Sequence, residues 1–179
     1  MKNYHIEIQQ ERGRVLISII ATKENKGKGK KQNAGKQFER DFYASVPADL
    51  FFYRLKDDSL GYLNVKNPCD FILYKYPTIY LFELKSHKGK SIPFSALQPF
   101  QVESLYQYSK VDGVKAGFVF NFRDVNETYF VDAVTVYQFY HVGERKSFFL
   151  EWAKENWVFI PQKLKRTRYQ YDLYNLLNY

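Results

Sequence analysis

The sequence predicts an α/β fold in which a central mixed β-sheet is flanked by helices. Stretches rich in β-branched and aromatic residues, which are typical of strands, alternate with stretches that follow helical spacing. From residue 33 onward they come in the order helix, strand, strand, helix, strand, strand. A chain of 179 residues with 45% hydrophobic content is long enough to bury one ordinary core. We therefore expect a single domain over residues 33–179, preceded by a separate segment over residues 1–32.

The N-terminal segment divides into an apolar part and a basic part. Residues 15–20 read Val-Leu-Ile-Ser-Ile-Ile and suit either a strand or part of a helix, so the pattern leaves both open. Residues 23–36 contain six lysines and three glycines and have little apolar surface to bury. This Lys/Gly-rich stretch is predicted to be a flexible linker, a solvated loop or an arm that binds a negatively charged partner.

The remaining elements follow from local signals. Asn33 suits the cap of the first helix, Pro77 the turn between two strands, and Pro99 the first turn of the second helix. Val102 and Leu105 are spaced to pack one face of that second helix on the sheet. In chain order we expect a helix at 33–44, extended pieces at 50–55, strands at 70–74 and 79–86, a helix beginning near 99, strands at 115–122 and 128–131, and helices at 134–140 and 147–157.

Two carboxylates and a lysine on the first pair of strands form a candidate metal site. Glu83 and Lys85 are two residues apart, so a strand projects them to the same face. Asp70 opens the preceding strand, and the turn near Pro77 brings it back beside Glu83. Two carboxylates suit a hard cation such as Mg²⁺ or Mn²⁺, and a lysine beside them can position or deprotonate water. The order Asp70, Glu83, Lys85 along two neighbouring strands therefore indicates metal-dependent hydrolysis of a phosphodiester.

A blander explanation of the same motif is an exposed Glu/Lys pair on a strand with an unrelated aspartate nearby. The sequence around the motif favours the metal site, because Ile79-Tyr80-Leu81-Phe82 is strongly apolar and the charges do not belong to a generally solvated stretch.

Composition points to a polyanion as partner. The chain carries 27 Lys+Arg against 19 Asp+Glu, a net charge of +8 and a pI near 9.3. Its single cysteine, Cys69, excludes an internal disulfide and a cysteine-based metal cage. There is no apolar run of about 18 residues and no signal-peptide pattern, so we expect no membrane partner and a cytoplasmic location, in a bacterium or, for a phage gene, in its host.

Four blocks of the chain resemble the RecU family of Holliday junction resolvases, found in Gram-positive bacteria and their phages, within the PD-(D/E)xK nuclease superfamily. The blocks are GKQFERDF, NPCDF, LFELKSHKGKSIPFSALQPFQVESL, and the pair AGFVFNF and ETYFVDA; the tail FIPQKLKRTRYQYDL is similar as well. Together they span residues 33–176, and the third block is the most specific.

The resemblance implies a restriction-endonuclease-like core and assigns roles to five residues. It makes Asp70 and Glu83 the metal ligands, Lys85 the catalytic lysine and Gln101 a site glutamine on the second helix. Glu39 on the first helix matches an acidic residue that completes many such sites through water. For Glu39 and Gln101 the alternative is a polar residue on the solvated side of an amphipathic helix.

The chain departs from the family pattern at two places. Leu81 stands where the family has an acidic residue two positions before the glutamate, so a second strand ligand is missing and metal binding rests more on Asp70. Only about thirty residues separate Glu39 from Asp70, whereas cellular members carry a longer insertion there that forms a protruding stalk. The short segment over residues 50–66 puts junction selectivity in doubt and favours a phage-type relative.

Basic residues in several places are expected to contact DNA. Those near the C-terminus are interleaved with Tyr169, Tyr171 and Tyr174, which suits a phosphate backbone and an unstacked base, although the same pattern fits the outer face of a terminal element. The full set is Lys28, Lys30, Lys31, Lys36, Arg54, Lys56, Lys88, Lys165, Arg166 and Arg168.

We therefore expect a Mg²⁺-dependent Holliday junction resolvase, with Mn²⁺ as a second metal, that nicks four-way DNA junctions in symmetric pairs and leaves 5′-phosphate ends. Paired nicks need two active sites, so a homodimer is expected; a recombinase partner is left open. One alternative is a nuclease of the same superfamily without junction selectivity. Another is a DNA-binding recombination accessory protein that does not cleave, and an RNA-binding module is remoter still.

Overall fold

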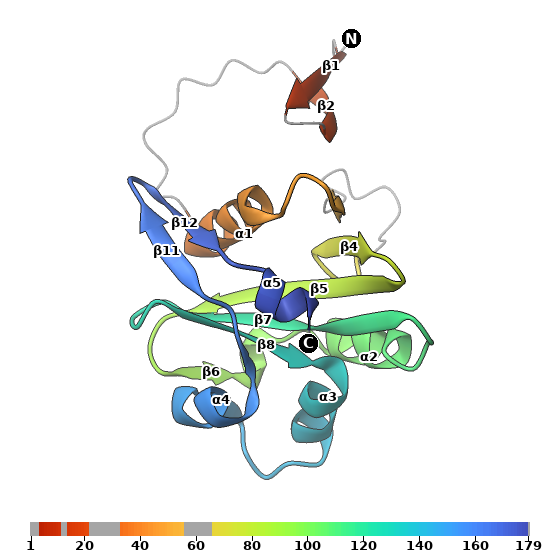
Figure 1. Ribbon diagram of the computed structural model, residues 1–179. Helices are drawn as coiled ribbons and strands as arrows, with labels where there is room; N and C mark the ends of the chain where they lie inside the picture. The colour runs from red at the N-terminus through yellow and green to blue at the C-terminus, as the bar shows by residue number, and fades with distance from the viewer. Residues whose placement is uncertain (1–3, 12–13, 22–32, 56–65, 179) are drawn as a thin grey trace.

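The computed structural model describes residues 4–11, 14–21, 33–55 and 66–178 (Figure 1). Near the N-terminus β1 (Tyr4–Glu11) pairs antiparallel with β2 (Arg14–Ala21), with Tyr4 opposite Ala21. The apolar residues 15–20 thus belong to a strand, which settles the ambiguity left by their sequence.

A six-stranded mixed sheet forms the centre of the molecule, in the order β10-β8-β7-β5-β4-β3. Neighbouring strands run antiparallel except β5 and β7, which are parallel and are joined through the helix α2. The strands are β3 (Phe51–Arg54), β4 (Phe71–Lys75), β5 (Thr78–His87), β7 (Val114–Phe122), β8 (Glu127–Asp132) and β10 (Val158–Phe159).

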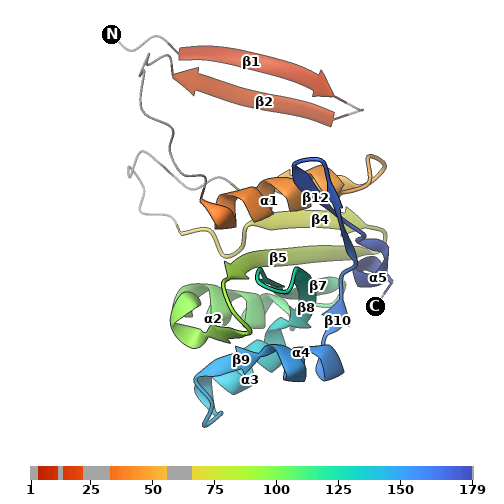
Figure 2. The ribbon, with the colours of Figure 1, turned by 90° about the vertical axis from the view of Figure 1, so that its left-hand side faces the viewer.

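Helices cover both faces of this sheet, which confirms the predicted fold class. Figure 2 shows α1 on one face and α2, α3 and α4 on the other. The helices are α1 (Ala34–Ser45), α2 (Pro99–Tyr108), α3 (Ala133–His141), α4 (Leu150–Asn156) and the short α5 (Tyr174–Leu177). None of the helices in the described part of the chain is long and apolar enough to cross a membrane.

The caps and the packing faces of α1 and α2 agree with the sequence signals. The Asn33 side chain accepts a hydrogen bond from the Gly35 amide at 3.0 Å, and Pro99 lies in the first turn of α2. Val102 and Leu105 are fully buried against the sheet. The start of α2 is therefore held in place, and with it the side chains that α2 directs toward β5.

The prediction of a helix over residues 147–157 is wrong at its start. Residues Ser147–Phe149 form the strand β9, which pairs antiparallel with β6 (Ser91–Pro93), and the helix α4 begins only at Leu150. Phe148 is buried in the core and contacts other aromatic rings. An extended backbone suits these aromatic residues, and the pairing with a distant strand satisfies their backbone groups.

The C-terminal part forms a second hairpin that lies along α1. Here β11 (Gln162–Lys165) pairs with β12 (Arg168–Tyr171). The Asp41 Oδ2 atom accepts the backbone N–H of Tyr169, and Ser45 Oγ accepts that of Tyr171, each at 2.9 Å. Asp41 is itself buried and receives a hydrogen bond from Gln37 at 2.6 Å. A polar stripe of α1 therefore fixes the hairpin to the body.

Candidate active site

Asp70 lies immediately before β4 and is joined to β5 by two hydrogen bonds. Its backbone N–H donates to the Phe82 carbonyl at 3.0 Å, and its Oδ2 accepts the Leu84 N–H at 2.8 Å. These two bonds flank Glu83 on β5. The predicted meeting of Asp70 and Glu83 across two strands is therefore what the backbone arrangement produces.

Lys85 links Glu83 to Gln101. Its Nζ lies 2.7 Å from Glu83 Oε1 and donates to Gln101 Oε1 at 3.1 Å. Gln101 comes from α2 and is 8% exposed, so it does not lie on a solvated helix face. Glu83 and Lys85 point to this side because they alternate with Phe82 and Leu84, which belong to the core under α1.

The two carboxyl groups share a poorly solvated environment. Burial and the charge of Asp70 raise the pKa of Glu83 to about 8, and the charge and hydrogen bond of Lys85 offset part of this rise. Burial also raises the pKa of Asp70 to about 6; the Leu84 N–H lowers it, and the charge of Glu39 raises it further. Two acids with raised pKa values in one place are typical of a functional site, although structural ion-pair networks shift pKa values too.

These residues fit a hard divalent cation. Glu83 Oε2 is buried and has no hydrogen-bond partner in the described part of the chain, so this oxygen is left for a ligand. Carboxylate oxygens are the donors that Mg²⁺ and Mn²⁺ prefer, and Mg²⁺ usually keeps several waters. Within residues 33–55 and 66–178 no cluster of three or more His, Cys, Asp or Glu side chains is placed to hold a metal. Asp70 and Glu83 would therefore be a pair of protein ligands, with water and substrate completing the shell.

Leu81 is the strand position at which the sequence departs from the family pattern expected above. It lies on β5 two residues before Glu83, hence on the same face, and packs partly buried against the core on the α2 side. The side chain at this point of the sheet therefore makes an apolar contact with the core.

Glu39 approaches the site from α1 but is engaged elsewhere. Its carboxylate forms an ion pair with Arg54 of β3. It is still near enough to raise the pKa of Asp70, which Arg54 opposes. The structure therefore brings Asp70, Glu83, Lys85 and Gln101 together and leaves Glu39 at the border of the site.

Cys69 precedes Asp70 and is buried, with its Sγ 3.5 Å from the Phe71 carbonyl oxygen. Burial, assisted by the charges of Glu83 and Asp70, raises its pKa to about 12, so the thiol stays protonated. It is a packing group rather than a nucleophile.

The basic residues expected to contact DNA fall into three groups. Lys36, Lys88, Lys165, Arg166 and Arg168 are exposed, the last three on the β11–β12 hairpin. Arg54 is partly exposed and paired with Glu39. The predictions for Lys28, Lys30, Lys31 and Lys56 lie outside the described residues.

Sequence reasoning missed a chain of polar side chains that crosses the sheet from the site strand to the hairpin. Ser86 donates to Asn121 at 3.0 Å, Asn121 donates to Thr128 at 2.9 Å, and Thr128 donates to Gln162 at 2.5 Å. Asn121 and Thr128 are buried. Their signal was available, since each interrupts an otherwise apolar strand, and buried polar groups need partners.

Comparisons with known proteins give the family of the chain. The family model described as RecU, recombination protein U, matches residues 52–172. The SPbeta prophage-derived uncharacterized protein YotM of Bacillus subtilis (strain 168) is 34% identical over 123 residues, which are 64% of this chain. The chain spans 63% of the length of that relative. Among solved structures, Hjc of Archaeoglobus fulgidus, described as a Holliday junction resolvase from an archaeal hyperthermophile, is similar with a TM-score of 0.41 and 19% identity. The match covers 56% of this chain and 78% of Hjc.

Proposed function

Because the chain belongs to the RecU family, we propose that it is a divalent-metal-dependent Holliday junction resolvase that introduces paired, symmetric nicks in four-way DNA junctions. The observation that carries the proposal is the group formed by Asp70, Glu83, Lys85 and Gln101, in which Glu83 and Gln101 are buried and Glu83 Oε2 has no hydrogen-bond partner among the described residues.

Asp70 and Glu83 would hold the metal. When bound, Mg²⁺ or Mn²⁺ supplies positive charge that offsets the phosphate and makes water more acidic. Lys85 is held between Glu83 Oε1 and Gln101 Oε1. In that position its Nζ would orient the attacking water or stabilise the charge that develops on the phosphate. Gln101 would act as a positioning residue, because it interacts with the side chains of Lys85 and Glu83.

Several finer features belong to the same proposal. Residues 33–179 would form one nuclease domain that works as a homodimer in the cytoplasm and leaves 5′-phosphate ends. Two nicks on one junction need two sites related by a twofold axis, which supports the dimer. The exposed cations Lys36, Lys88, Lys165, Arg166 and Arg168 would bind DNA phosphates, as would Arg54 beside the site.

Leu81 supports a second candidate. With two carboxylates instead of three, the chain would bind metal more weakly. A family member that binds branched DNA without cutting it would be expected to have such an incomplete set of metal ligands. Such an accessory protein would keep its binding and biological activity when Asp70 is replaced, whereas an enzyme would bind and no longer cut.

The test is cleavage of a labelled synthetic four-way junction beside a matched linear duplex, with Mg²⁺, with Mn²⁺ or with EDTA. Asp70→Asn is the site variant, because the amide oxygen can still accept the Leu84 N–H, and the exposed Asp112→Asn is its control. We expect metal-dependent cutting of the junction that Asp70→Asn abolishes and Asp112→Asn retains. Equal cutting of junction and duplex would show a nuclease without junction selectivity, and binding without cutting in either metal would support the accessory protein.

A further inference from the structure

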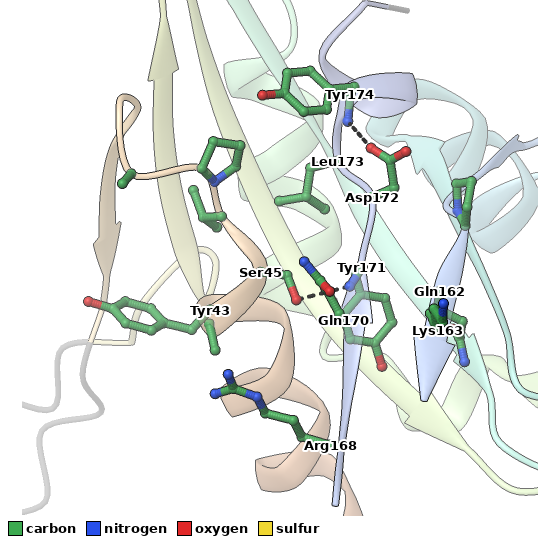
Figure 3. Close-up of a pocket in the computed structure, with 15 residues that line it drawn as sticks. Tyr43, Ser45, Gln162, Lys163, Arg168, Gln170, Tyr171, Asp172, Leu173 and Tyr174 are labelled. Atoms are coloured by element: carbon green, nitrogen blue, oxygen red, sulfur yellow. Dashed lines mark hydrogen bonds between the residues drawn. The ribbon is translucent and has the colours of Figure 1, made fainter. Parts of the chain in front are cut away.

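A groove on the α1 side of the sheet, away from the carboxylates, has the properties of a strand-binding site. It has a volume of about 930 Å³ and lies between the C-terminal end of α1 with the Val46-Pro47-Ala48 segment and the strand β12 with the residues after it (Figure 3). The hydrogen bond from the Tyr171 N–H to Ser45 Oγ joins the two walls. Buried Tyr171 and Leu173 line it from the hairpin side. The walls of the groove are therefore held in place by the fold itself.

An aromatic ring and basic side chains lie at different places along this groove. Figure 3 shows Tyr174 near one end and Arg168 near the other. Tyr174 is 57% exposed, and its N–H donates to Asp172 Oδ1 at 3.0 Å, which fixes the turn that presents the ring. Arg168 and Lys163 are exposed cations, whereas Asp172 is the one acidic group among the lining residues. The groove thus combines a ring that is free to stack with a net positive charge.

A second, smaller hollow of about 360 Å³ continues from the groove. It shares Ala44 and Arg168 with the groove and is also lined by Arg40, Thr167, Gln37 and the carboxylate of Asp41, which accepts hydrogen bonds from Gln37 and the Tyr169 N–H. Arg40 is exposed on α1 and donates to Gln37 at 2.8 Å, so its guanidinium is held along the helix. Across the two hollows, Lys163, Arg168 and Arg40 outnumber Asp172 and Asp41, and we call the two together the basic track.

We infer that this track binds an unpaired DNA strand, with a base stacked on Tyr174 and phosphates along Lys163, Arg168 and Arg40. A duplex presents its bases already stacked, whereas an unpaired nucleotide can enter a recess and stack on a ring. A positively charged groove with an exposed ring is the usual composition of a single-strand site. A negatively charged strand also suits a chain of net charge +8 better than a peptide does.

The inference rests on the proposed function in that it assigns the track to the branched substrate. At a four-way junction each strand passes from one pairing partner to another, so nucleotides become unpaired when the base pairs beside the crossover open. The track would hold one such opened strand on the face of the sheet opposite the carboxylates. The hairpin that carries the track is tied to β8 through Gln162 and to α1 through Asp41 and Ser45, so its position relative to the site is defined.

The test is fluorescence anisotropy in EDTA with the full chain, using a labelled oligothymidylate and a labelled duplex of the same length. Tyr174→Ala should weaken oligothymidylate binding at least about fivefold, as expected for the loss of one stacked base, with a smaller effect on the duplex. Tyr174→Phe should restore it, because the ring is kept. Arg168→Ala should lower the slope of log K against log salt by about 1. Tyr108→Ala and Arg145→Ala, exposed residues outside the track, are the matched controls.

Equal losses on oligothymidylate and duplex for Tyr174→Ala would overturn the inference, because the ring would then not distinguish unpaired bases. Unchanged oligothymidylate binding in Tyr174→Ala and in Arg168→Ala would also overturn the inference and would leave a peptide as the occupant of the groove. Since binding is measured without metal, these outcomes are independent of cleavage. A protein that binds the oligonucleotide through Tyr174 but never cuts a junction would refute the proposed resolvase and leave the track intact.

Discussion

Without metal, the stability of this protein should fall as the pH rises, and Glu83 should be the main cause. In the folded protein the pKa of Glu83 is about 8, against 4.5 for an ordinary glutamate. Between these values the folded state keeps a proton that the unfolded chain has released. Stability decreases with pH wherever the unfolded state binds fewer protons, so the contribution of Glu83 is greatest below about pH 4.5 and is lost as the pH rises to about 8.

The size of the effect follows from the same pKa values. One pKa unit corresponds to about 1.4 kcal/mol, so the shift of Glu83 costs up to about 5 kcal/mol at pH 8 and above. That is a large part of the stability of an ordinary domain. Glu83→Gln removes the titrating group and most of this slope. A bound divalent cation would offset the cost, because it stabilises the ionised carboxylates.

The assay is urea unfolding in EDTA from pH 5 to 9, followed by the fluorescence of Trp152 and Trp157. The wild type should lose stability over this range, Glu83→Gln should lose much less, and the exposed Glu155→Gln should follow the wild type. Adding Mg²⁺ at pH 8 should stabilise the wild type and not Glu83→Gln. Wild-type stability that is flat or rises with pH, or equal slopes in the two proteins, would refute the reasoning.

Three further predictions concern the site and the sheet. Lys85→Ala should slow junction cleavage by about 10² or more while junction binding in EDTA stays unchanged, measured by single-turnover kinetics and anisotropy. Leu81→Asp should tighten Mn²⁺ binding in calorimetry, because it adds a carboxylate on the same face of β5 as Glu83. It should also lower the free energy of unfolding by about 1–3 kcal/mol through lost apolar packing. Unchanged Mn²⁺ affinity would contradict the placement of the metal on this face. Gly117→Ala should destabilise by about 2 kcal/mol or more in urea, since its Cβ would lie 2.3 Å from the Val131 carbonyl oxygen, whereas Gly35→Ala, with its nearest neighbour at 3.4 Å, should be neutral or stabilising.

The arrangement of the site on the sheet was predictable because it depends on local rules. Strand alternation sends Glu83 and Lys85 to one face, and a short turn returns β5 beside Asp70. The first turn of α2 was also predictable from Pro99. The sequence could not show how deeply Glu83 is buried, because its burial depends on tertiary packing, in which α2 places the buried Gln101 beside Lys85.

Long-range contacts explain the other differences. Asp41 and Ser45 resemble the solvated side of a helix in sequence, yet they accept backbone N–H groups from a strand more than a hundred residues away. The strand β9 is three residues long, too short for a periodic signal, and forms because β6 pairs with it. Local sequence patterns do not indicate which distant residues will pair, so neither the hydrogen bonds of Asp41 and Ser45 nor the strand β9 could be predicted from the sequence alone.

The most direct test of the resolvase proposal is the product formed from a supercoiled plasmid that extrudes a cruciform, in Mg²⁺. Paired nicks at one junction convert the plasmid directly to the linear form, whereas single nicks give open circles. We expect linear DNA as the first product for the wild type and none for Asp70→Asn. Open circles alone, or equal attack on a plasmid that lacks the cruciform, would contradict the paired cleavage of four-way junctions by this site.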